Sequence, residues 1–209
     1  MEIIFFVLGA IVASFVGVLV ARLNTGQSII GWPPCLPAGR SRCDACNKPL
    51  TFLSLVPIFS FFALNGRTAC CGTNLSWRAP ATEIILGGFF VGAYLNLGLT
   101  SALLFFLISL STLLALVLYD LSHQVLPTLP LAVFVVSSAL VGFITESSIT
   151  TFLSSLVVPV LIAMSLFLIY FFSDGRAMGF ADTPLVFGLA LLAGPAALSG
   201  FIFSFWVGA

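Results

Sequence analysis

Long runs of apolar residues alternate with short polar segments along this chain. The runs occupy residues 3–21, 84–97, 102–119, 129–144 and 152–172, and a final apolar stretch covers 184–209. A membrane-spanning helix needs roughly 20 predominantly apolar residues, and the second run approaches that length by extending back to residue 79. Gly194-Pro195 interrupts the final stretch, which predicts either one helix and a partial second or a pair of short helices there.

The pattern therefore predicts an all-α integral membrane protein with about six to seven transmembrane helices. Composition agrees, because 60% of the residues are hydrophobic and only 7% are charged, whereas soluble domains carry about 25% charged residues. A lipid bilayer is the expected environment. The net charge is zero, and nothing in the composition indicates nucleic acid as a partner.

The basic residues predict how the chain is oriented. Six of them precede the second run, at Arg22, Arg40, Arg42, Lys48, Arg67 and Arg78, and the seventh is Arg176, before the final stretch. Lys and Arg in short loops stay on the cytoplasmic side. An external N-terminus places all seven on that side, together with the 120–127 turn.

We expect three parts in the chain. Residues 1–21 form a first transmembrane helix, which we expect to be retained because it is long enough to span and follows the acidic Glu2 rather than a basic segment. Residues 22–82 form a small cytoplasmic loop domain that holds all five cysteines. Residues 83–209 form the polytopic part.

The cysteines of the loop suggest a metal site. A C-x-x-C knuckle is followed by a vicinal pair, which gives four candidate zinc ligands: Cys43, Cys46, Cys70 and Cys71. The reducing cytosol favours metal over disulfide. The second knuckle is defective, because Thr68 stands where a ligand is expected and adjacent cysteines rarely reach one metal; Cys35 is a replacement candidate. The alternative is that these are unliganded remnants.

Two aspartates stand at the ends of apolar runs on the predicted cytoplasmic side. Ionisable groups at membrane depth are candidates for function, and Asp120 and Asp182 would form a pair if they met. One carboxylate of such a pair activates a water while the other, protonated, serves as the acid. Gly179 permits close approach of a backbone beside Asp182. The alternative is that both are ordinary interfacial acids.

Several motifs in order resemble those of the bacterial prepilin peptidases. They are ASFVG at 13–17, ARLNTGQSI at 21–29, RCDAC at 42–46, LVPIFS at 55–60, LNGR at 64–67 and SWRAPATE at 76–83. Asp120, with Leu126-Pro127, is similar to the family's D-x-x-x-x-x-L-P-D motif, and Asp182 is similar to the aspartate of its G-x-G-D motif. The resemblance runs from residue 3 to about residue 194.

The resemblance implies a membrane aspartic endopeptidase of the bacterial inner membrane, with Asp120 and Asp182 as its catalytic pair. Its substrates would be type IV pilin or pseudopilin precursors, cut on the cytoplasmic side after a glycine that ends a short basic leader. Many members then methylate the new N-terminus with S-adenosylmethionine. Glu83 and Arg78 match positions of the family's loop and, with Gly179, are expected to have supporting roles.

The chain departs from the family pattern at four points. Ala181 replaces the second glycine of G-x-G-D, and would tilt the aspartate if its φ were positive. Thr128 follows Leu126-Pro127 in place of Asp, and Thr68 breaks the second knuckle. The family also continues through further apolar segments, which suggests a fragment or a minimal member.

Two other functions compete with the peptidase. A proton-coupled transporter would use the acids as relay sites, but such sites lie near the bilayer midplane. A catalytically inactive relative would bind pilin-like helices without cleaving them.

Overall fold

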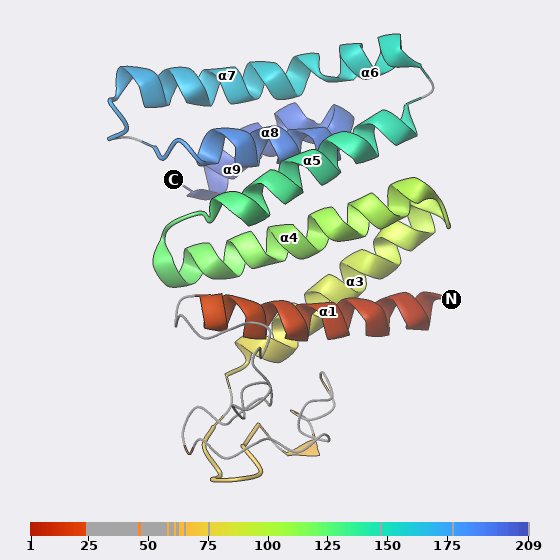
Figure 1. Ribbon diagram of the computed structural model, residues 1–209, viewed down its shortest axis with the longest axis vertical. Coiled ribbons are helices and arrows are strands. Elements are labelled where there is room, and N and C mark those ends of the chain that lie inside the picture. The colour runs from red at the N-terminus through yellow and green to blue at the C-terminus, as the bar shows by residue number, and fades with distance from the viewer. Residues whose placement is uncertain are drawn as a thin grey trace, which may run out of the picture. The chain divides into compact units, whose positions relative to one another are not determined.

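A computed structural model describes most of the chain outside the predicted loop domain (Figure 1). The described residues are 1–23, 46, 58, 61, 63, 64, 66–74, 76–146, 148–176 and 178–208. Cys35 and Cys43 lie outside them. The chain divides into two compact units, Met1–Leu95 and Asn96–Ala209.

The described residues are almost entirely helical. The first unit contains α1 (Glu2–Leu23) and most of α3 (Arg78–Leu97). The second contains α4 (Ser101–His123), α5 (Thr128–Thr145), α6 (Ile149–Ser155), α7 (Val157–Phe172), α8 (Asp182–Ala193), the 3₁₀ turn η2 (Gly194–Ala196) and α9 (Ala197–Gly208). Within the described ranges, six stretches are long and apolar enough to cross a membrane. The prediction of an all-α, multi-pass membrane protein is confirmed.

Helices α1 and α3 pack antiparallel through a glycine contact. A Cβ built on Gly9 would lie 2.8 Å from the Cα of Gly87, so the two backbones touch. Near the start of α1 and the end of α3, the rings of Phe5 and Tyr94 stack with their centroids 4.6 Å apart. Small residues allow this close approach between helices in a membrane.

Two of the long apolar stretches contain a break with a clear cause. Between α6 and α7, Pro159 has no N–H to donate to the carbonyl of Ser155, and the helix is interrupted at Leu156. After α8, Gly194 adopts a positive φ of 53°, which ends the helix. Helices α8 and α9 each have 12 residues. Of the two alternatives for the final stretch, the pair of short helices is correct.

Helix α5 forms the centre of the second unit, because it packs against both α4 and α8 (Figure 1). Leu116 of α4 joins Leu131 and Phe134 of α5 in a buried cluster, against which Leu185 of α8 packs. Gly188 makes room for the Phe134 ring, since a Cβ there would lie 2.6 Å from it. A hydrogen bond from the buried Ser109 hydroxyl of α4 to the Ser137 hydroxyl of α5, 2.8 Å long, also joins these two helices.

Candidate functional site

The two candidate aspartates lie at the same end of the second unit. Asp120 is in the last turn of α4, and Asp182 is the first residue of α8. Figure 1 shows the α4–α5 turn and the α7–α8 connection at the same end of the bundle. The even number of membrane crossings between the two acids accounts for this placement.

The apolar cluster beneath these turns relates the two acids more closely. Leu116 lies four residues before Asp120, on the same face of α4, and Ala181 immediately precedes Asp182. Both belong to or pack against the cluster centred on Phe134, as does Leu126 of the α4–α5 turn. The segments that carry the two acids thus both meet one apolar cluster, which also contains Leu131 and Phe134 of α5.

A reciprocal pair of hydrogen bonds holds Asp182. Its backbone N–H donates to the carbonyl oxygen of Gly179 at 3.2 Å, and the Gly179 N–H donates to Oδ2 of Asp182 at 3.1 Å. A Cβ on Gly179 would lie 3.4 Å from the same Oδ2, an ordinary contact. The turn therefore fixes the orientation of the carboxylate.

The alanine that replaces the second glycine of the family motif fits this turn. Ala181 has φ −67° and ψ −19°, in the right-handed helical region that any L-residue adopts. Its side chain packs against the Phe134 cluster. The positive φ that would have tilted Asp182 is absent.

Aromatic residues stand close to each acid along the chain. Phe180, 59% exposed, contacts Tyr170 at the end of α7 with ring centroids 5.6 Å apart. In the last turn of α4, Tyr119 contacts His123 with ring centroids 4.7 Å apart. Each of the two turns therefore contains a packed aromatic pair.

The two residues expected to support the loop have different surroundings. Glu83 of α3 is only 7% exposed, accepts a hydrogen bond from the Ile58 N–H at 2.6 Å, and is hydrogen-bonded by the Ser14 side chain of α1. It therefore ties one loop residue to both helices. Arg78 is exposed at the start of α3, where its N–H donates to the Ser76 hydroxyl at 3.2 Å.

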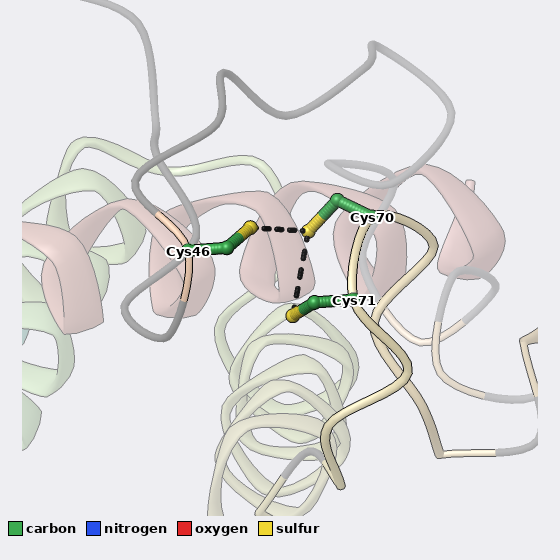
Figure 2. A group of neighbouring side chains, drawn as sticks. All are labelled: Cys46, Cys70 and Cys71. Carbon is green, nitrogen blue, oxygen red and sulfur yellow. Dashed lines mark hydrogen bonds between the residues drawn. The ribbon is translucent and has the colours of Figure 1, made fainter.

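Three of the predicted metal ligands come together. The Cys46 thiol lies 3.3 Å from Sγ of Cys70, which lies 3.8 Å from Sγ of Cys71 (Figure 2). All three sulfurs lie within 4.8 Å of one another. Zn–S bonds of about 2.3 Å imply sulfurs about 3.8 Å apart in a tetrahedral site, so the spacing suits a metal ion. The vicinal cysteines do reach one position.

Thr68, which stands where the sequence pattern leads one to expect a metal ligand, contacts a ligand of this cluster instead. Arg67 and Asn74 form an isolated antiparallel bridge that closes a tight turn. In that turn the hydroxyls of Thr68 and Thr73 each lie 3.2 Å from Sγ of Cys71. Hydroxyls so placed can donate to a thiolate and orient a metal ligand.

Sequence reasoning assigned no role to Ser14, Thr73 or Thr183. Ser14 belongs to the first family-like motif, and that membership was a signal for it. Thr73 follows the vicinal cysteines by two residues, but nothing in the sequence brings its hydroxyl back to Cys71. Thr183 directly follows Asp182, but nothing in the sequence shows that its hydroxyl oxygen is buried.

Comparison with known proteins gives a consistent family. Residues 7–97 match the family described as the bacterial peptidase A24 N-terminal domain. A prepilin leader peptidase/N-methyltransferase of Myxococcus xanthus is 36% identical over 122 residues, which are 58% of this chain and 34% of that protein. The enzyme of the same name from Klebsiella pneumoniae is 37% identical over 130 residues, 60% of this chain and 56% of that protein.

A third relative of that name, from Bacillus subtilis, is 30% identical over 124 residues, which are 59% of this chain and 47% of that protein. The chain thus spans roughly a third to a little over half the length of these curated relatives. No solved structure matches it.

Proposed function

We propose that this chain, which belongs to the family of the bacterial prepilin leader peptidases, is a membrane aspartic endopeptidase. Asp120 and Asp182 are its catalytic pair, and type IV pilin or pseudopilin precursors are its substrates. The observation that supports the proposal is that both acids belong to segments at one end of the second unit, and that residues of both segments meet one apolar cluster.

The proposed reaction needs nothing beyond the two carboxyl groups and a water. The ionised carboxylate takes a proton from water, whose oxygen attacks the carbonyl carbon of the scissile peptide bond. The protonated carboxyl group gives its proton to the departing amine as the C–N bond breaks. The hydrogen bond from Gly179 holds the Asp182 carboxylate in a fixed direction during these steps.

The membrane geometry suits a substrate with two unlike parts. A pilin-like precursor combines a short basic leader with an apolar helix, which would lie in the bilayer beside the exposed Phe180. We place the N-terminus outside and the active site at the cytoplasmic face of the bacterial inner membrane. Both acids stand at helix ends rather than mid-helix, which argues against a proton relay of the transporter type.

The cysteine cluster fits a structural zinc ion held by Cys46, Cys70 and Cys71. Bound zinc would supply folding free energy to a loop too small for a large core. We assign that loop to residues 22–82. The resemblance also implies methylation of the new N-terminus with S-adenosylmethionine. Most of the loop expected to carry that activity lies outside the described residues, so no contact with the methyl donor is assigned.

The test is cleavage of a pilin-like precursor co-expressed with the chain, followed by mass spectrometry. Asp120→Asn and Asp182→Asn should each abolish the mature product while the protein still inserts. Asp174→Asn is the matched control, because Asp174 is an exposed turn acid with φ 49°, a conformation that asparagine tolerates.

Full cleavage by either of the first two variants would reject the catalytic pair. Precursor binding without cleavage by the wild type would instead support an inactive relative. An added methyl group on the product would establish the second activity.

A further inference from the structure

One buried hydroxyl has no hydrogen-bond partner. Among the buried side-chain nitrogen and oxygen atoms of the described residues, Oγ1 of Thr183 alone lacks one. Other helical hydroxyls in this unit donate to a carbonyl one turn earlier, as do Thr112, Thr145 and Ser165. An unpaired buried polar group destabilises a protein and needs an explanation.

Thr183 directly follows Asp182 in the first turn of α8. By helical spacing it shares a face with Val186 and Ala190, which pack in one cluster with Ile162 of α7. That face accounts for the burial of the oxygen. The residue as a whole is still partly exposed.

The backbone at this end of α8 has no spare donor. The N–H groups of Asp182, Thr183 and Leu185 donate to the carbonyls of Gly179, Phe180 and Ala181. Pro184 has no N–H. In the first turn of α8, the Thr183 hydroxyl is therefore the donor left to meet a carbonyl arriving beside Asp182.

We propose that the Thr183 hydroxyl binds the peptide substrate by donating a hydrogen bond to a backbone carbonyl next to the scissile bond. A threonine in a helix uses two χ1 rotamers, and a rotation that exchanges oxygen and methyl turns the hydroxyl toward the exposed side. The inference rests on the proposed peptidase function and adds a substrate-binding group to it.

The proposal predicts opposite effects on stability and on function. Without substrate the buried hydroxyl is unsatisfied, so replacing it with a methyl group of similar shape should stabilise the protein. With substrate the same replacement removes a hydrogen bond, which is worth about a five- to tenfold change in binding. A packing role alone would move both quantities in the same direction.

The experiment compares Thr183→Val and Thr183→Ser with the wild type in detergent, using a purified type IV pilin precursor. We expect Thr183→Val to raise the melting temperature and to lower kcat/KM about five- to tenfold. Thr183→Ser should retain most of the activity. Thr112→Val is the control, since the Thr112 hydroxyl already donates to the Ile108 carbonyl; its kcat/KM should match the wild type.

A wild-type kcat/KM for Thr183→Val, or an equal loss in Thr183→Ser, would overturn the proposal. Precursor binding by chains that also carry Asp120→Asn provides a second measurement. If the wild type does not cleave the precursor, the peptidase assignment is rejected, and the role of Thr183 is then judged from precursor binding alone. Weaker binding with Thr183→Val than with Thr183→Ser would still support the hydroxyl as a peptide-binding group, and equal binding would reject it.

Discussion

The glycine contact between α1 and α3 gives a prediction whose magnitude follows from the structure. In Gly9→Ala, the new Cβ would lie 2.8 Å from Cα of Gly87 and 2.9 Å from the carbonyl oxygen of Leu86. Carbon atoms pack at about 3.5–4.0 Å, so the overlap is about 0.7–1.2 Å. Backbone atoms cannot rotate away as a flexible side chain would, and the helices must separate.

Overpacking of this kind costs about 1–3 kcal/mol. Alanine also favours a helix over glycine by about 1 kcal/mol, which partly offsets the loss. Gly17→Ala is the matched control, because it lies in the same helix with nothing within 4 Å of its Cβ. The free energy of unfolding should therefore be about 1–3 kcal/mol lower for Gly9→Ala than for Gly17→Ala.

Thermal unfolding in detergent, followed by circular dichroism, measures the difference. A change of 1 kcal/mol moves the melting temperature by about 2–4 °C in a chain of this size. If the two variants melt together, α1 and α3 do not meet at Gly9 and Gly87. The hydrogen bond between Ser14 and Glu83, farther along the same pair of helices, would then lose its support as well.

Three further predictions concern the candidate site. Glu83→Ala should destabilise the first unit by about 1–3 kcal/mol, because it leaves the partly buried donors of Ile58 and Ser14 without this acceptor; Glu83→Gln, which keeps an acceptor, should lose less in the same thermal assay. Ala181→Gly restores the family motif but should not raise the cleavage rate, since the φ of Ala181 is already unstrained; a several-fold increase would show that the methyl group hinders Asp182. Cys70→Ser should reduce the zinc bound per chain, measured by elemental mass spectrometry after purification, and unchanged zinc would exclude Cys70 as a ligand.

The helices were predictable because a membrane span is a long, continuous run of apolar residues. The residues at which the helices end were harder to predict. The apolar run that predicts α4 stops at residue 119, but α4 continues to His123, where Gln124 in the left-handed conformation caps it by donating to the Asp120 carbonyl. Asp120 therefore lies inside the last helical turn. A change from apolar to polar residues marks the edge of the lipid and not the end of the hydrogen-bonded backbone.

Individual contacts depended on information that the sequence lacks. Among Gly87, Gly88 and Gly92 of α3, only Gly87 meets α1, while a Cβ on Gly88 or Gly92 would have nothing within 4 Å. The vicinal cysteines seemed unable to share a metal, but the tight turn closed by Arg67 and Asn74 brings both sulfurs near Cys46. In each case the contact depends on which face of the helix the residue occupies or on the geometry of the turn, and the residue type alone does not determine it.

The placement of the two acids shows the same limit of sequence-based prediction. Counting membrane crossings places Asp120 and Asp182 on one side of the bilayer, because α5 leaves that side and α7 returns to it. Counting does not make them neighbours, since α4 and α8 need not pack near each other. The structure adds the packing of α5 against both helices: its fully buried Phe134 lies in one cluster with Leu116 of α4, and Leu185 of α8 packs against that cluster. Gly188 permits this packing, because a Cβ there would lie 2.6 Å from the Phe134 ring. A larger residue at position 188 should therefore force α5 and α8 apart and lower the melting temperature, although it alters neither acid.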